Sequence, residues 1–183
     1  MGVEELENRY VSSVQEQTNL TGAFGNTSGE IISKTDLKTV LDSAYTFYLD
    51  GLSYSDHGSL QITLVEAFEQ QKQVDLHVTE DLNIKAHPIR ATEQSRKFKI
   101  SFERPVGWQV VDESWCSFDE SETTDTSSRL QVIRNSKYFG YVKEQHGWYE
   151  HSLGPAEHYR VSTENEIIDV ISCDEPIVEE LLP

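Results

Sequence analysis

The chain has little cysteine and no long hydrophobic run, and each scarcity narrows the class of protein. Its 183 residues include only 2 Cys, without a CxxC pair or a histidine at ligand spacing, so a structural zinc site is not expected. The longest apolar runs are a few residues, too short to span a bilayer. The first residues, MGVEELENRY, are acidic and lack the apolar core of a secretory leader. We therefore expect a cytosolic protein without a membrane segment.

Basic residues are also scarce. Lys and Arg number 15 against 32 Asp and Glu, which gives a formal net charge of -17. Such a field repels nucleic acid and anionic lipid, because both carry dense phosphate charge, and it attracts basic protein partners. The alternative is that the charge serves solubility alone.

The charges are segregated along the sequence. Acidic residues dominate 42–69, 105–128 and 161–183, whereas six basic residues crowd 85–104. These six are Lys85, Arg90, Arg96, Lys97, Lys99 and Arg104. The pattern predicts acidic faces and one basic strip, and in so acidic a chain we expect the strip to pair internally.

Residues 1–29 form a polar lead-in, and 30–183 are long enough for a single domain with one core. KTDLKTVLDSA, residues 34–44, has helical spacing, although a strand is also compatible with it. Alternating apolar residues then predict strands that hold Tyr45, Phe47 and Leu49 and, after a turn at 55–58, Leu60, Ile62 and Leu64. Further strands are expected at 74–78, 96–102, 108–118 and 128–134.

After Ser136 the apolar residues no longer alternate as in a strand but have helical spacing. Ser136 can cap a short helix that ends at Gly147. Two last strands, EHYRVST and EIIDVISC, are expected to form a hairpin, after which Pro176 ends the pairing and leaves an acidic tail. About seven strands with one or two short helices predict an α+β domain, mainly antiparallel β-sheet.

The stretch HGWYEHSLGPAEHYRV, residues 146–161, admits two functional readings. A bend at Gly154-Pro155 can bring His151 and His158 together with Glu150, which would make a metal-binding protein or a metal-dependent enzyme. Trp148 and Tyr149 either cover the core or stand exposed as a binding anchor, for example for a sugar. The ordinary alternative is a solvated loop. Nucleophile elbows and phosphate-binding glycine loops are absent from the sequence, so we expect neither an enzyme of those classes nor a cofactor.

WQVVDESWCSFDESETTD, residues 108–125, gathers aromatic and acidic residues. On a strand, Trp108 and Glu113 would face opposite ways, so one tryptophan is expected in the core while the other is free to anchor a partner. The acids would form a rim that matches basic side chains, or would simply keep a loop solvated. The predicted partner-binding residues are Asp112, Glu113, Trp115, Asp119, Glu120, Glu122 and Asp125.

From SRLQVIRNSKYFGYV to HYRVSTENEIIDVISCDEP the expected order is strand, capped short helix, and hairpin closing with a proline. This layout resembles uncharacterised bacterial proteins, some of the immunity type that neutralise polymorphic toxins. The resemblance covers less than a third of the chain and carries no functional residue. It implies a non-enzymatic cytosolic inhibitor of a basic toxin such as a nuclease, and we adopt that hypothesis, with the acidic segment 112–125 and the tail at 174–180 as the surfaces it would use.

Overall fold

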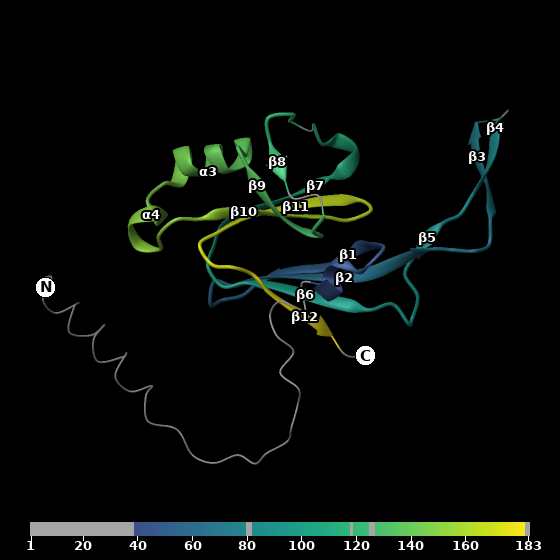
Figure 1. Ribbon diagram of the computed structural model, residues 1–183, viewed down its shortest axis with the longest axis horizontal. Coiled ribbons are helices and arrows are strands. Elements are labelled where there is room, and N and C mark those ends of the chain that lie inside the picture. Colours follow the sequence, from purple (N-terminus) through teal and green to yellow (C-terminus); the bar gives the residue numbers. More distant parts are fainter. Residues whose placement is uncertain (1–38, 80–81, 118, 125–126, 182–183) are drawn as a thin grey trace, which may run out of the picture. The chain divides into compact units, whose positions relative to one another are not determined.

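The computed structural model describes residues 39–181 apart from 80–81, 118 and 125–126, all within one compact unit, Ile32–Pro183 (Figure 1). The lead-in 1–29 and the first residues of the expected helix, 34–38, lie outside the described residues. Helical structure is present at 39–42, within that expected helix. The predicted class is confirmed: the fold is α+β and mainly antiparallel β, with short helices.

The first sheet has the strand order β1-β2-β6-β12, and the two-residue β5 pairs with β2. Its strands are β1 (Thr46–Tyr54), β2 (Leu60–Glu69), β5 (Ile89–Arg90), β6 (Lys97–Phe102) and β12 (Ile177–Leu181). The predicted hairpin of β1 and β2 is confirmed, and Gly58 supplies the positive φ of 81° that its turn requires. A bulge at Asp50 shifts the register of β1, so that Leu52, like Leu49, packs against the core.

The second sheet has the order β7-β11-β10-β9-β8. Its strands are β7 (Pro105–Asp112), β8 (Thr123–Thr124), β9 (Leu130–Arg134), β10 (Glu157–Ser162) and β11 (Glu166–Ser172). The helices α3 (Lys137–His146) and α4 (Tyr149–Ser152) lie on the outer side of this sheet (Figure 1). Separately, β3 (Val74–Thr79) and β4 (Leu82–Ala86) form a two-stranded hairpin.

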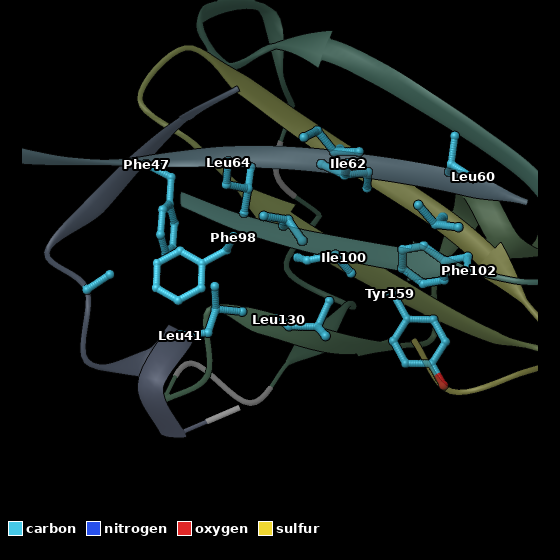
Figure 2. Packing of buried hydrophobic residues seen from close by; sticks show 14 residues of the cluster. Leu41, Phe47, Leu60, Ile62, Leu64, Phe98, Ile100, Phe102, Leu130 and Tyr159 are labelled. Carbon is cyan, nitrogen blue, oxygen red and sulfur yellow. The ribbon is translucent and has the colours of Figure 1, made fainter. Parts of the chain in front are cut away.

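The core lies between the two sheets. Leu60, Ile62 and Leu64 of β2 are fully buried, as their alternation predicts, and they meet the inward side chains of β6 (Figure 2). From the second sheet Leu130, Tyr159 and residues of β11 join the same cluster. The Phe102 and Tyr159 rings, one from each sheet, lie 5.6 Å apart between centroids. The apolar alternation of both sheets therefore serves one shared interior.

The chain passes between the sheets twice at neighbouring places. β6 continues into β7, and β11 continues into β12, while β6 pairs with β12 and β7 pairs with β11. Arg104 in the first connection binds Asp174 in the second, with N–O distances of 2.5 Å. The four strands thus form a two-stranded ribbon that bends from one sheet into the other.

Three local predictions are wrong. Tyr45 precedes β1 and is exposed, because β1 begins only at Thr46. The strand expected over 108–118 ends at Asp112, whose carboxylate accepts a hydrogen bond from Ser114 N and starts the 3-10 helix η1 (Glu113–Trp115). Pairing does not end at Pro176 either: β12 follows it on the edge of the first sheet, where Glu179 lies opposite Lys99 and pairs with it at 2.7 Å.

The shared interior predicts the effect of a core deletion. Phe102→Ala should lower the free energy of unfolding by about 3–5 kcal/mol, because it removes a fully buried ring that packs on Tyr159. Tyr141→Ala, on the exposed side of α3, is the control and should change it by less than about 0.5 kcal/mol. Urea unfolding followed by tryptophan fluorescence measures both. Equal effects from the two substitutions would contradict the placement of the core.

Candidate functional site

Trp115 stands out from the surface at the end of β7. Its side chain is 81% exposed, whereas Trp108, within β7 itself, packs against the core. The predicted division between the two tryptophans is therefore confirmed. The position of Trp115 is set by η1: Asp112 caps it, and Glu113 N donates to Asn165 O at 2.8 Å, which fastens it to the turn between β10 and β11.

Four carboxylates belong to the end of β7 and to the turn and strand beside it. Asp112 and Glu113 lie three and two residues before Trp115, and Glu166 lies opposite Asp112 in the pairing of β11 with β7. Glu164 belongs to the turn whose next residue accepts the hydrogen bond of Glu113. We call Asp112, Glu113, Trp115, Glu164 and Glu166 the Trp115 surface. Among the described residues, none of its carboxylates forms an ion pair with Lys or Arg.

Among the described residues, the cations of the two sheets other than Arg90 of β5 already have partners within the chain. Arg96 binds the fully buried Glu66 with two hydrogen bonds of 2.7 and 2.8 Å, which confirms internal pairing for part of the predicted basic strip. Arg129 donates to the backbone carbonyls of Ala44 and Tyr45. Ion pairs with carboxylates occupy Arg96, Lys97, Lys99, Arg104, Arg134, Lys137, Lys143 and Arg160. The negative charge at the Trp115 surface is therefore not neutralised by an ion pair within the described part of the chain.

Of the other predicted site residues, Asp119 and Glu122 form ion pairs within the chain, whereas no such role is described for Glu120 or Asp125. Asp119 forms an ion pair with Lys137, and hydrogen bonds from Lys137 and Ser121 hold the pKa of its carboxyl well below the usual range. Glu122 binds Arg160 at 3.2 Å and is largely covered. Glu120 is exposed, and Asp125 lies outside the described residues. In the acidic tail, Asp174 and Glu179 likewise bind Arg104 and Lys99.

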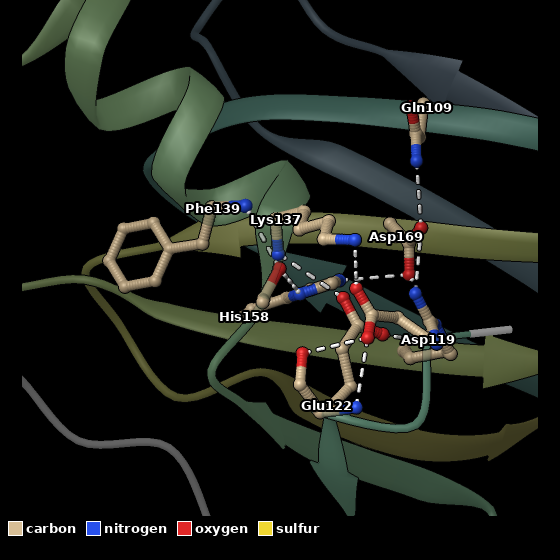
Figure 3. A network of polar contacts seen from close by, with 10 residues as sticks. Gln109, Asp119, Glu122, Lys137, Phe139, His158 and Asp169 are labelled. Atoms are coloured by element: carbon tan, nitrogen blue, oxygen red, sulfur yellow. Dashed lines mark hydrogen bonds and ion pairs between the residues drawn. The ribbon is translucent and has the colours of Figure 1, made fainter.

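A buried polar network lies beneath α3, on the outer face of the second sheet (Figure 3). Asp169 of β11 accepts hydrogen bonds from His158 Nε2 at 2.8 Å, Arg160 Nε at 2.6 Å and Gln109 Nε2 at 2.8 Å. His158 Nδ1 lies 2.7 Å from Ser136 Oγ, and Ser136 in turn accepts from Phe139 N as the predicted helix cap. The network joins three strands to the start of the helix.

The contacts run from Ser136 to His158 to Asp169, as they do in the catalytic triad of a hydrolase. The two histidine nitrogens, however, are used differently. In such a triad the serine meets Nε2 and the acid meets Nδ1, and here the two nitrogens are exchanged. The side chain of His158 is 0% exposed, and Ser136 Oγ is engaged with the helix backbone. The arrangement holds charge in place and leaves no route for a substrate to the imidazole.

The histidine stretch does not converge on a metal. His158 uses both ring nitrogens inside the network, and Glu150 binds Lys143 at 2.7 Å. His151 lies instead against the Trp148 ring, 5.9 Å between centroids. Within the described part of the chain, no group of three or more His, Cys, Asp or Glu side chains could hold a metal ion. The geometry therefore gives the metal-binding alternative no support.

Trp148 and Tyr149, the expected aromatic pair, point to different environments. Tyr149 is buried and Trp148 is 86% exposed. Burial raises the pKa of the Tyr149 hydroxyl. The nearby hollow at Trp148 is polar and lined in part by Lys143 and Glu144. Within the described residues its ring contact is with the His151 imidazole, and no Trp or Tyr ring lies beside it to extend a surface on which a sugar could stack.

A groove opens at the opposite edge of the sheets, between β9 and β12. Leu130, Val132, Tyr159 and Val178 line it, with Glu157 and Glu175 also contributing, and its volume is about 190 Å³. Sites for small molecules usually enclose about 300–1,000 Å³, so this groove is small for a metabolite.

Comparison of the chain with protein-family models, curated proteins and solved structures gives no match. The described helices are all too short or too polar to cross a membrane. The functional argument therefore rests on the residues of this chain alone.

Sequence reasoning missed Glu164 and Glu166 as members of the site. They belong to the predicted turn and strand of the final hairpin, but nothing in their spacing shows that this hairpin meets β7. The partners of Asp119 and Glu122 were missed for the same reason, because they are distant in sequence. One exposed tryptophan was predicted from alternation along a strand, but Trp115 lies in η1, after β7 has ended.

The buried network predicts an acid-sensitive stability. Burial alone would raise the pKa of Asp169, but hydrogen bonds from His158, Arg160 and Gln109 outweigh it and lower the pKa from 3.8 to about 2. Because the pKa is lower in the folded state, the stabilisation is complete above the unfolded value and is lost as the pH falls from about 4 to about 2. This part of the unfolding free energy should amount to about 2 kcal/mol.

Asp169→Asn should abolish that component and also destabilise the protein at neutral pH by about 3 kcal/mol, since Arg160 loses its buried partner. Urea unfolding at pH values from 2 to 7, with the exposed Asp56→Asn as control, measures the difference. A variant whose pH profile parallels that of the wild type would show that Asp169 carries no such stabilisation.

Proposed function

We propose that this chain is a non-enzymatic protein-binding module that recognises a basic partner through the Trp115 surface. The observation that carries the proposal is an 81% exposed tryptophan among carboxylates that have no cation to pair with in the described structure. Tryptophan is enriched among residues that dominate binding energy, because its large ring can be desolvated in a pocket of the partner. The surrounding acids supply orientation and attraction over a distance.

Internal pairing strengthens this argument. Apart from Arg90 of β5, the described Lys and Arg side chains in the two sheets bind carboxylates of the same chain or, for Arg129, backbone carbonyls. Bringing a basic partner to the Trp115 surface therefore requires no internal ion pair to break. The charge of -17 over the whole sequence would also accelerate the encounter at low salt.

The sharper form of the proposal is an inhibitor, of the immunity type, that occludes a basic toxin such as a nuclease. A nuclease cleft is shaped for phosphate, so an acidic surface can occupy it in place of the substrate. The resemblance of residues 128–176 to such proteins agrees with this form. An inhibitor also needs no chemistry of its own, in keeping with the enclosed position of Ser136 and His158.

The tryptophan gives the first test. The whole chain is immobilised and exposed to lysate of its source cells, and the affinity of the captured basic protein is then measured with purified components. Trp115→Ala should weaken binding by about 30-fold or more, as expected for a central anchor. Trp148→Ala is a matched control, since it removes another exposed tryptophan, and should change the affinity by less than about twofold.

Charge reversal gives an independent test. Glu113→Lys combined with Glu164→Lys should slow association with the same partner by about tenfold at low salt, and the difference should shrink as salt is added. Glu69→Lys combined with Glu93→Lys changes the net charge equally at two exposed positions, one at the end of β2 and one in the turn before β6, and should slow it much less. If both pairs act alike, only the overall charge matters, and if neither the charge pair nor Trp115→Ala acts, the interface lies elsewhere.

The inhibitor form of the proposal is tested separately, by measuring the activity of the captured partner. The captured partner should carry an activity, such as hydrolysis of nucleic acid, that the wild-type chain abolishes at equimolar concentration. Trp115→Ala should restore that activity at concentrations near the wild-type dissociation constant. A partner that remains fully active when saturated would rule out inhibition while leaving the binding function in place.

A further inference from the structure

Among the described residues, the two five-stranded sheets end in β1, β12, β7 and β8, and three of these four edges are protected. β1 carries the bulge at Asp50, whose carboxylate also binds Lys97 at 2.8 Å. β12 has five residues, two of them glutamates, and β8 has only two residues. Short strands, charges and bulges are the usual devices that prevent an edge from pairing with another chain.

β7 carries a bulge near its start, where the pairing with β11 skips Val106, but from Gly107 to Val111 it has none of these devices. It is the terminal strand of the second sheet, has eight residues, and contains no charged residue before Asp112. Pro105 stands at its first position, where it does not interrupt the edge. The strand leads directly into η1 and Trp115, so the unprotected edge adjoins the Trp115 surface.

The register shows which backbone groups point outward. Glu113 N donates to Asn165 O, and hydrogen-bonded pairs alternate along an antiparallel ladder. The odd-numbered residues of β7 therefore bond to β11, and the even-numbered residues Trp108 and Val110 direct their N–H and C=O groups to the free edge. The thiol of Cys116 approaches Asp112 O at 3.6 Å from that side, as expected for an outward carbonyl.

Apolar side chains near this edge are more exposed than a completed sandwich would leave them. Val110 is 42% exposed although it shares a face with Trp108, which packs against the core. Tyr54, at the end of β1, is 53% exposed and stacks on Trp108 with 4.8 Å between ring centroids. One additional strand beside β7 would cover both Val110 and Tyr54.

We propose that the free edge of β7 receives an extended basic segment of the partner as an added β-strand, with Trp115 at one end of the contact. This inference rests on the proposed function and specifies how the partner binds. Backbone hydrogen bonds to Trp108 and Val110 supply affinity, and Asp112 and Glu113 select lysine or arginine in the segment. A second copy of this chain is the less suitable occupant, because it would bring its own acids to an edge that already lacks cations.

The test uses a defined probe, an acetylated and amidated ten-residue peptide of alternating lysine and threonine. Its binding to the isotope-labelled whole chain is followed by amide resonances and by amide hydrogen exchange. The amides of Trp108 and Val110 should shift and exchange at least about tenfold more slowly with the peptide bound, because they then donate to its carbonyls. The same peptide N-methylated throughout, and a glutamate–threonine peptide, should bind at least about tenfold more weakly.

Val110→Pro is the decisive variant. It removes an outward N–H that β11 does not use, so the protein should still fold while peptide affinity falls by about tenfold or more. Val111→Pro is the matched control, since it removes an N–H bonded to β11 and should instead lower the unfolding midpoint. Protection of the wild-type amides tests the same contact without any substitution.

The outcomes separate this inference from the proposed function. If the lysate partner still depends on Trp115 and Glu113 but neither it nor the peptide responds to Val110→Pro, strand addition is overturned and the binding function stands. Failure of the peptide to bind the wild type also overturns strand addition. A dimer seen in sedimentation without peptide, and lost in Val110→Pro, would make a second copy the occupant and overturn the proposed segment.

Discussion

The hydrogen bonds that the buried carboxylate of Asp169 accepts hold together the outer face of the second sheet. This carboxylate is buried on β11, and it receives hydrogen bonds from Gln109 of β7 and from His158 and Arg160 of β10. Through His158 it reaches Ser136 and the start of α3, and through Arg160 it reaches Glu122 in the loop before β9. One charge thus fixes a helix, a loop and three strands, and the strand that leads to Trp115 is among them.

The other charged residues follow a similar pattern. The chain has about two acids for every base, and it uses its bases at structurally demanding places, such as the buried Glu66 and the paired connections at Arg104 and Asp174. The acidic residues that remain unpaired are therefore not spread evenly over the surface. At the end of β7 they coincide with the exposed tryptophan and the unprotected strand edge, and this coincidence of three independent features makes the region distinctive.

Much of the fold could be predicted from alternation, because a strand with one buried face records that face in its own sequence. Phe98, Ile100 and Phe102 on β6 and the triplet on β2 are examples. Trp115 is exposed for another reason, because it lies in η1, after β7 has ended. Features that depend on distant partners could not be predicted. β12 was missed because its pairing with β6 joins residues far apart in sequence, and Asp119 was assigned to the surface because Lys137 lies across a loop. The end of β7 was missed because a short capping contact at Asp112 outweighs the propensity of the following aromatic residues.

The position of β12 has a consequence for biosynthesis. The first sheet opens with β1 near the start of the described region, yet its outermost strand is not available until Leu181 has left the ribosome. β6 must wait, with one edge unpaired, while about eighty further residues are translated. The nascent chain therefore depends for that interval on its charge, and on any bound chaperone, to keep an apolar half-sheet from associating with its neighbours.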